Sequence, residues 1–277
     1  MTRSRDWRSS EDTTPPIAGQ FDAIACLYDE LMAGVPYSEW ISYVERILLR
    51  MGRQLRVQAG AELHVHTIHR VLDLCCGTGT VSALLADLGC DVVGVDISSE
   101  MIEIARRKAR DKGRNIEYRV GDASSFTVPG KFDLAVSFFD SLNYITEADQ
   151  LQQAFYRVSE HLEPGGLFIF DMNTEFALAA GFFDQRSLVS NRPVTYDWKS
   201  VYDPATRICR VSMSFRYRRG GEVSLIDLTH FQRAYDIGEV SGMLRSAGFE
   251  VHAVYAGYSF RPATSTSDRV FFVAGKV

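Results

Sequence analysis

The chain begins with a polar stretch, and two segments with the apolar spacing of helices follow. Residues 1–20 are polar and charged and predict a disordered tail. Apolar side chains then recur at helical spacing, at Phe21, Ile24, Leu27 and Leu31. Gly34 and Pro36 end this helix, and Ser38 is the expected N-cap of a second one. We therefore expect a helical N-terminal segment over residues 21–66.

From Arg70 onward, short apolar runs alternate with helical patterns. The apolar runs predict strands over 71–76, 91–96, 116–120, 132–139 and 166–172. Helical patterns separate several of them, over 80–89, 98–113 and 149–162. Strands that alternate with helices form a parallel sheet with helices on both faces. We therefore expect residues 67–173 to form an α/β core with a doubly wound, mostly parallel sheet.

After the last of these strands, apolar and polar residues alternate with a period of two. This alternation predicts antiparallel strands over 194–202, 207–219 and 222–231. Asp203-Pro204-Ala205-Thr206 and Gly220-Gly221 are the expected turns between them. Residues 174–235 are therefore expected to be a β insertion that serves as a lid or substrate wall. The chain then returns to a helix and two strands, so we expect 236–277 to complete the core sheet.

The composition is that of an ordinary globular protein, with 46% hydrophobic and 23% charged residues among 277. The net charge of −5 argues against tight, nonspecific nucleic-acid binding, because such binding depends on neutralising phosphates. Five cysteines without a CxxC pair predict free thiols in a reducing compartment. We find neither a secretory signal nor a run of about 18 apolar residues. We expect a cytoplasmic monomer or homodimer without a membrane partner.

The stretch VLDLCCGTGT, residues 71–80, ends a predicted strand in a glycine-lined turn. Asp73 lies inside this apolar strand, where a charge is costly unless it is paired; it either serves binding or caps the turn. Gly77 and Gly79 allow a ligand to approach the backbone at the N-terminus of the next helix. Ser82 replaces the third glycine of the dinucleotide fingerprint, which counts against a nicotinamide cofactor. No Gly-Lys-Ser/Thr follows, so a P-loop is excluded.

Two acidic residues end the next two strands. Asp96 follows Gly77 by 19 residues, where a carboxylate can accept both hydroxyls of a ribose. Its alternative role is an N-cap for the helix that starts near Ser98. Asp122 lies in a Gly-Asp turn after the third strand, where it either accepts from an adenine amino group or only makes the turn. With the glycine turn, these residues indicate an adenosine-containing ligand.

The chain resembles class I S-adenosylmethionine-dependent methyltransferases in six successive stretches: VLDLCCGTGT, VVGVDIS, SSEMIEIARRKA, VGDASSF, FDLAVSFFDSLNYI and LEPGGLFIFDMNT. The resemblance covers residues 70–277. It extends to FDAIACLYDELM, which is similar to the lid helix of small-molecule methyltransferases, including sugar-amine N-methyltransferases. It implies a Rossmann-like, seven-stranded sheet of order 3-2-1-4-5-7-6, a helical lid over 21–66 and a late antiparallel insertion. It also implies the cofactor S-adenosylmethionine, which leaves as S-adenosylhomocysteine.

The resemblance implies a role for each matching residue. The residues expected around the methionine half of the cofactor are Asp73, Cys76, Gly77 and Gly79. Asp96 would hold the ribose, and the residues expected around adenine are Ile97, Met101, Asp122 and Ala123. The aromatic residues expected near the sulfonium, methyl and carboxylate groups are Tyr28, Trp40, Phe138 and Phe139. For Trp40 the alternative is a core position. Cys75-Cys76 departs from the family, which more often has Gly, Ala or Ser at one of these positions. We expect no effect on the site, because cysteine packs as a small hydrophobic side chain.

The methyl acceptor has no comparable signature. Methyl transfer is a direct displacement at carbon, in which positioning contributes roughly 7–11 kcal/mol. A hydroxyl acceptor needs a base, and a neutral amine does not. The candidate catalytic residues are His230, Asp140 and Tyr28, with His230 preferred as base or substrate ligand because histidine titrates near neutrality. The expected substrate-binding residues are Asn143, Asn173, His230 and Arg233. Structural roles are the alternative for each of them.

The main prediction is transfer of a methyl group from S-adenosylmethionine to a nitrogen or oxygen of a small molecule. One alternative is a methyltransferase that acts on RNA or protein, against which the acidic balance and the absence of Asn/Asp-Pro-Pro-Tyr and Pro-Cys motifs argue. Another is a non-catalytic S-adenosylmethionine-binding module. The histidines of HVHTIH, at 64, 66 and 69, lack a cysteine or acid to complete a ligand set, so we expect no metal.

Overall fold

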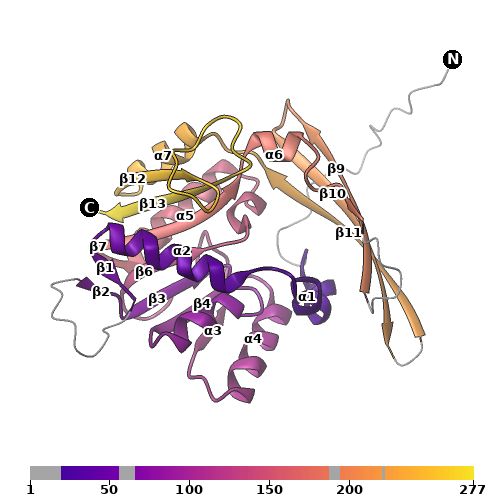
Figure 1. Ribbon diagram of the computed structural model, residues 1–277, viewed down its shortest axis with the longest axis horizontal. Coiled ribbons are helices and arrows are strands. Elements are labelled where there is room, and N and C mark those ends of the chain that lie inside the picture. The colour runs from indigo at the N-terminus through magenta and orange to yellow at the C-terminus, as the bar shows by residue number, and fades with distance from the viewer. Residues whose placement is uncertain (1–19, 56–65, 187–193, 220–221) are drawn as a thin grey trace.

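A mixed sheet of seven strands forms the centre of the computed structural model, which describes residues 20–55, 66–186, 194–219 and 222–277 (Figure 1). The sheet order is β12-β13-β7-β6-β3-β4-β5. These strands are β3 Arg70–Leu74, β4 Asp91–Asp96, β5 Glu117–Val120, β6 Phe132–Ser137, β7 Leu162–Asn173, β12 Phe249–Ala256 and β13 Arg269–Lys276. Only β13 runs antiparallel to both of its neighbours. Numbered within this sheet, the order is 3-2-1-4-5-7-6, so the predicted topology is confirmed.

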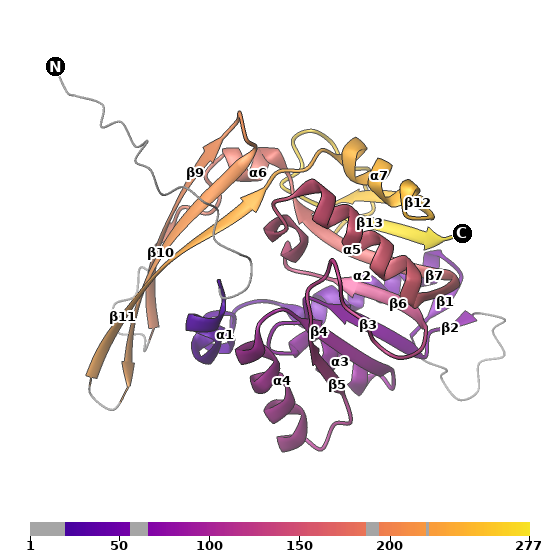
Figure 2. The ribbon, with the colours of Figure 1, turned by 180° about the vertical axis from the view of Figure 1, so that it is seen from behind.

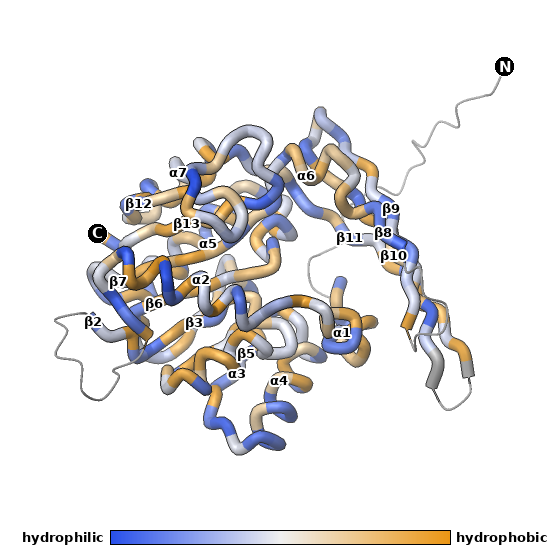
Figure 3. Tube along the Cα trace, viewed as in Figure 1, coloured by the Kyte–Doolittle hydropathy of each residue, from blue (hydrophilic) through white to orange (hydrophobic). Residues whose placement is uncertain are grey.

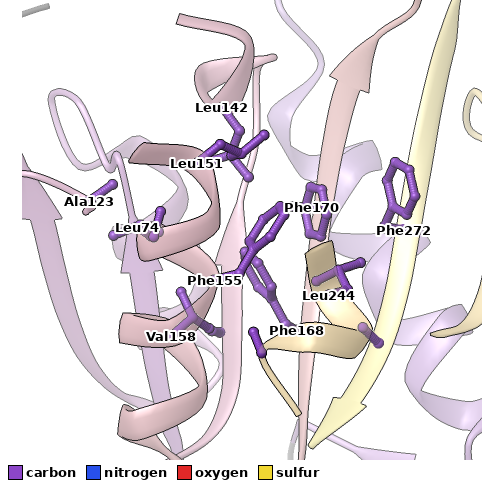
Figure 4. Close-up of a cluster of buried hydrophobic side chains, with 14 of the residues drawn as sticks. Leu74, Ala123, Leu142, Leu151, Phe155, Val158, Phe168, Phe170, Leu244 and Phe272 are labelled. Carbon is purple, nitrogen blue, oxygen red and sulfur yellow. The ribbon is translucent and has the colours of Figure 1, made fainter. Parts of the chain in front are cut away.

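Helices cover both faces of this sheet: α2 Tyr37–Arg50, α3 Thr80–Asp87, α4 Ser99–Asp111, α5 Ala148–His161 and α7 Ile237–Ser246. On one face, Phe155 of α5 and Leu244 of α7 pack against Phe168, Phe170 and Phe272 of the strands (Figure 4). Side chains of α2 and α3 cover the opposite face. Burying each such side chain contributes about 1.5–3 kcal/mol. The packed sheet therefore fixes the positions of the loops that follow its strands.

The structure tests two predictions about the residues that cap helices. The helix α2 begins at Tyr37, because the Pro36 carbonyl already accepts from the backbone N–H of Glu39 at 2.9 Å. The prediction that Ser38 is the N-cap was therefore wrong. At α4, the hydroxyl of Ser98 accepts from the N–H of Met101 at 3.1 Å. Asp96 is thus not the N-cap of that helix, so its predicted contact with a ribose stays a prediction.

The insertion forms its own four-stranded antiparallel sheet, which stands beside the core (Figures 1 and 2). Its strands are β8 Gln185–Arg186, β9 Val194–Asp203, β10 Ile208–Arg219 and β11 Glu222–Arg233. Along β10 the buried side chains alternate with exposed ones, and hydrophilic and hydrophobic positions are interspersed along the inserted strands (Figure 3). This is the predicted period of two. The short β8 and the helix α6 Glu175–Ala179 were not predicted, because so few residues show no periodicity.

The first helices lie between the core and the insertion (Figure 2). They are a 3-10 turn, η1 Asp22–Ile24, and α1 Ala25–Leu31. Ile24 belongs to a buried cluster with Val211 and Phe215 of β10. On the core side, Asp29 accepts from the hydroxyl of Thr78 at 2.5 Å and pairs with Lys108 at 2.6 Å. The first part of the predicted lid, residues 21–31, is thus attached to both neighbours, and this part is called the lid below.

The connection from the lid to the core contains two short strands, β1 Arg53–Gln54 and β2 His66–Thr67, which pair in parallel. Residues 1–19 of the predicted tail, His64 and the predicted Gly220-Gly221 turn lie outside the described residues. Gln20, the last residue of the predicted tail, is buried. In the described part of the chain, no helix has the length and apolar character needed to span a membrane.

Candidate active site

The glycine turn after β3 has a backbone that only particular residues adopt. Gly77 and Gly79 have φ values of +54° and +75°, in the left-handed region that glycine enters without cost. A Cβ on Gly79 would lie 2.3 Å from the hydroxyl of Tyr118, so this position has no room for a side chain. A Cβ on Gly77 would meet no atom within 4 Å. The backbone of Gly77 is therefore open to a ligand.

Asp73 is a buried carboxylate beside this turn. It is 2% exposed and accepts from the hydroxyl of Ser82 at 2.5 Å. Burial raises the pKa of Asp73 to about 7, and the hydrogen bond from Ser82 opposes this shift. Ser82, noted in the sequence only as the missing third glycine, thus supports the acid. A carboxylate held in this way is suited to pair with an ammonium group.

Asp73 borders a small cavity of about 50 Å³. Its wall combines the glycine turn with aromatic side chains, including Cys76, Gly77, Thr78, Tyr28, Tyr37, Trp40, Phe138 and Phe139. Three of the four predicted methionine-side residues, all except Gly79, therefore meet all four of the predicted aromatic residues in one place. Tyr37 was not predicted, because its position at the start of α2 follows only from how that helix packs.

Asp96, the last residue of β4, is hydrogen-bonded to the glycine turn. Its carboxylate accepts from the N–H of Gly77 at 2.8 Å and from the N–H of Ser98 at 2.9 Å. Burial raises the pKa of Asp96, and these two hydrogen bonds oppose the shift. Carboxylate oxygens have further lone pairs, so Asp96 can still accept from hydroxyl groups.

The residues predicted around adenine follow β4 and β5. Met101 and Ala123 are buried, whereas Ile97 and Asp122 are partly exposed. The carboxylate of Asp122 accepts from the N–H of Ser124 at 2.7 Å, which is the turn role considered above. None of the four lines the small cavity. Their adenine-binding role stays a prediction.

Aromatic side chains connect the start of α2 to the end of β6. The ring centroids of Trp40 and Phe139 are 5.2 Å apart, and those of Trp40 and Tyr37 are also 5.2 Å apart. Trp40 is 7% exposed, so it is both a core residue and part of the cavity wall. Phe139 has φ +68°, a strained conformation for such a side chain. Strained backbone conformations of this kind persist only where the surrounding structure holds them in place, and they cluster at functional sites.

A second cavity, of about 320 Å³, adjoins the first. Tyr28, Phe139 and Ser141 line both cavities. The lid, the end of β6 and the inner face of the insertion form the wall of the larger one, which includes Phe21, Tyr144, Trp198, Met213 and His230. A molecule in the larger cavity would therefore lie directly beside one in the smaller cavity.

His230 is one of the residues that line the larger cavity. It is 1% exposed, and its Nε2 lies 2.7 Å from the carbonyl oxygen of Gln20. A carbonyl only accepts, so Nε2 carries the proton and the neutral ring keeps its lone pair on Nδ1. Nδ1 is buried and has no partner among the described residues. Burial lowers the pKa of His230, and the bond to Gln20 opposes this. The ring is therefore neutral.

Tyr28 and Asp140 differ from His230 as candidate bases. Burial, followed by the neighbouring phenols Tyr37 and Tyr144, raises the pKa of Tyr28 well above its usual value, so it stays a neutral phenol. Asp140 lines the larger cavity but is already engaged. It pairs with Arg269 at 2.7 Å and accepts from Gln232 at 2.8 Å.

Arg269 is the centre of a buried ionic group that the sequence did not reveal. Besides Asp140 it pairs with Asp171, and both carboxylates are at most 5% exposed. Burial lowers the pKa of Arg269, but the two carboxylates raise it more, so the guanidinium stays charged. Burial raises the pKa of Asp171, and Arg269 opposes this. The pairs join residues of β7 and β13 with the loop after β6, which no spacing in the sequence indicates.

Asn143, Asn173 and Arg233 lie in the same region but line neither cavity. The side chain of Asn143 donates to the carbonyls of Asn173 and Arg233, and it accepts from the N–H of Asn173. Arg233 donates to the carbonyl of Thr146 at 3.0 Å. These bonds connect β11 with β7 and the loop after β6. Substrate binding by these three stays a prediction, and their contacts are those of a scaffold that holds β11 in place.

Among the described residues, the cysteines and the histidines of the HVHTIH stretch form no further candidate site. Cys75 and Cys76 are free, and burial raises the pKa of both thiols, so neither is a ready nucleophile. Within the described ranges, no group of three potential metal ligands occurs.

Comparisons of the sequence and of the structure with known proteins indicate a methyltransferase. A model of the family "Methyltransferase domain" matches residues 71–166. The putative methyltransferase YqeM of Bacillus subtilis (strain 168) is 32% identical over 257 residues, which cover 92% of this chain and 97% of that protein. A solved S-adenosylmethionine-dependent methyltransferase from Clostridium acetobutylicum ATCC 824 has a TM-score of 0.78 at 26% identity, over 92% of this chain and 98% of its own.

A more distant structure shares the fold. The sugar N-methyltransferase KedS8 from Streptoalloteichus sp ATCC 53650 has a TM-score of 0.71 at 18% identity, over 100% of this chain and 98% of its own. At this identity the similarity concerns the fold alone.

Proposed function

Since the chain belongs to the methyltransferase family, we propose that it transfers the methyl group of S-adenosylmethionine to a nitrogen or oxygen of a small molecule. Family membership confirms the prediction of a methyltransferase that uses this cofactor. The finer proposal rests on one observation. The small cavity beside Asp73 and the larger cavity, which His230 lines, share a wall made of Tyr28, Phe139 and Ser141.

The residues of the smaller cavity fit the methionine half of the cofactor. Asp73 would pair with its ammonium group, and the open backbone of Gly77 would accommodate its chain. Asp96 would accept from the ribose hydroxyls, beside the predicted adenine residues. The bound cofactor supplies an electrophilic methyl group with a good leaving group already attached.

The residues of the larger cavity position the acceptor and take its proton. With the cofactor bound, a nitrogen or oxygen of the acceptor would take the methyl group and leave the bonding electron pair on sulfur, and Nδ1 of His230 would take the proton that the acceptor loses. Tyr28 remains protonated, so it acts as a hydrogen-bond donor at the shared wall and not as a base. Asp140 serves the reaction less directly, because Arg269 and Gln232 already occupy its carboxylate.

A small acceptor suits this cavity better than a polymer does. The lid is attached to the core through Asp29 and to the insertion through Ile24, so the cavity is bounded on two sides. Its volume of about 320 Å³ is at the lower end of the range for small-molecule sites. RNA or protein acceptors would need an open groove at this place.

The test combines cofactor binding with turnover. The full chain is titrated with S-adenosylmethionine by calorimetry and then incubated with a panel of small amines and phenols while S-adenosylhomocysteine is measured. We expect binding, and with an accepted substrate a loss of roughly 10²–10⁴-fold in kcat for His230→Gln at unchanged cofactor affinity. His252→Gln, on the exposed side of β12, is the matched control and should keep full turnover. Full activity of His230→Gln would remove the proposed base, and lack of cofactor binding would overturn the proposal as a whole.

A further inference from the structure

The larger cavity has walls made largely of aromatic rings. They come from three parts of the chain and include Phe21, Tyr28, Tyr144, Phe183, Tyr196 and Trp198. The rings of Phe21 and Tyr144 are 5.0 Å apart, and those of Tyr196 and Trp198 are 5.1 Å apart. Faces of aromatic rings attract cations and pack against flat apolar groups.

The charges at the cavity do not offer a site for an anion. Among the described residues of its wall, the only arginine or lysine is Arg269, which pairs with both Asp140 and Asp171. Two carboxylates around one guanidinium leave this group with a net negative charge. His230 is neutral, as shown above. A phosphate or carboxylate would lose its water here without gaining a free cation, which is costly.

Two buried polar atoms at the cavity wall have no partner among the described residues. One is Nδ1 of His230, an acceptor, and the other is Nε1 of Trp198, a donor. Buried polar groups are nearly always hydrogen-bonded, so these atoms are suited to bind a ligand. The acceptor matches an N–H group of the ligand, and the donor matches a neutral oxygen of the ligand.

We infer that the methyl acceptor is an amine with a flat, apolar body and no anionic group. This inference rests on the proposed function and narrows its acceptor class. The amine binds as an ammonium ion among the aromatic rings, near the negative Asp140 group. One proton of the ammonium is lost to solvent before the transfer, which leaves the nitrogen lone pair free to take the methyl group, while Nδ1 of His230 accepts a hydrogen bond from a remaining N–H. A neutral hydroxyl, ether or carbonyl oxygen on the same molecule would accept from Trp198.

Three probes that share a phenylethyl group and differ in their polar group test the charge preference. The full chain with bound S-adenosylhomocysteine is titrated with 2-phenylethylamine, 2-phenylethanol and 3-phenylpropanoate, and binding is followed by ligand-observed NMR. We expect the amine to bind roughly tenfold more tightly than the alcohol, and the carboxylate to bind most weakly. Binding of the carboxylate as tight as that of the amine, or equal affinity for all three, would overturn the inference. Failure of S-adenosylhomocysteine itself to bind would instead overturn the proposed function.

A variant with an added cation separates the cavity from the overall charge of the protein. Gln185 lines the cavity and is exposed, so Gln185→Lys should fold normally. We expect this variant to weaken amine binding and to strengthen carboxylate binding, each by several-fold. Ser212→Lys, on the exposed side of β10, adds the same charge to the same sheet and is the control. Equal effects of the two substitutions would overturn the assignment of the preference to this cavity.

Discussion

The two cavities are neighbours that share a wall, yet they are built in different ways. The smaller one comes mostly from the glycine turn after β3, the end of β6 and the start of α2, which belong to the common core. The larger one joins the lid, the loop after β6 and the inner face of the insertion. The first is therefore made by local turns at the ends of parallel strands, and the second exists only when distant segments are held together. This difference predicts that substitutions affect the two cavities separately.

The largest effect on stability is expected at the buried ionic group that holds the larger cavity. Arg269→Met would leave Asp140 and Asp171 buried without their cation, and we expect a loss of about 3–5 kcal/mol in the free energy of unfolding. Chemical denaturation measures this loss. The matched control is Arg114→Met, which breaks an ion pair with Asp87 at the surface and should change stability much less. Equal losses for both variants would contradict a special role of the buried group.

The next effect concerns the smaller cavity alone. Asp73→Asn keeps the shape of the side chain but removes the charge that pairs with the ammonium group. We expect a loss of about 1.5–3 kcal/mol in binding of S-adenosylmethionine, measured by calorimetry, at unchanged binding of an acceptor probe. Asp87→Asn, at the surface, is the control. Undiminished cofactor affinity would contradict the role assigned to Asp73.

The pH dependence of cofactor binding sharpens this assignment. Burial raises the pKa of Asp73 to about 7 in the free protein, so the carboxylate becomes protonated as the pH falls below 7. Only its charged form pairs with the ammonium group. Affinity should therefore fall as the pH is lowered from about 7, by up to roughly tenfold per pH unit. In Asp73→Asn this dependence should disappear. The same slope in both proteins would assign it to another group.

The smallest effect is expected at the attachment of the lid. Asp29→Ala removes the ion pair with Lys108 and the hydrogen bond from Thr78. Both ionic side chains are partly exposed, so the loss in stability should be about 0.2–1 kcal/mol. A looser lid should nevertheless raise KM for the cofactor more than it lowers kcat. Glu30→Ala, next to it on α1, is the control. A KM equal to that of the unmodified protein would show that this attachment does not govern closure.

The difference between the cavities also explains which predictions the sequence supported. Asp73, Gly77 and Asp96 lie within 24 residues and come together because parallel strands end at the same edge of a sheet. Spacing therefore predicted a ligand-binding turn with acids beside it, and the resemblance to methyltransferases implied the role of each residue. Asn143 and Asn173 also lie near strand ends, but the side chain of Asn143 bonds to the backbone of Asn173, the side chain of Asn173 donates to Gln232, and neither residue lines a cavity. Spacing places a side chain at the edge of the sheet without telling which way it points.

The resemblance to methyltransferases implied the strand order, whereas the sequence by itself determined the alternating strands and helices, the glycine turn with its acids, and the alternation that gives β10 a buried and an exposed side. These features depend on local periodicity and on short connections. Only the tertiary structure decided the state of His230, because the carbonyl that sets its tautomer belongs to Gln20, 210 residues away. Arg269 likewise meets Asp140 across 129 residues. Such contacts depend on how separate elements pack, and no local pattern records them.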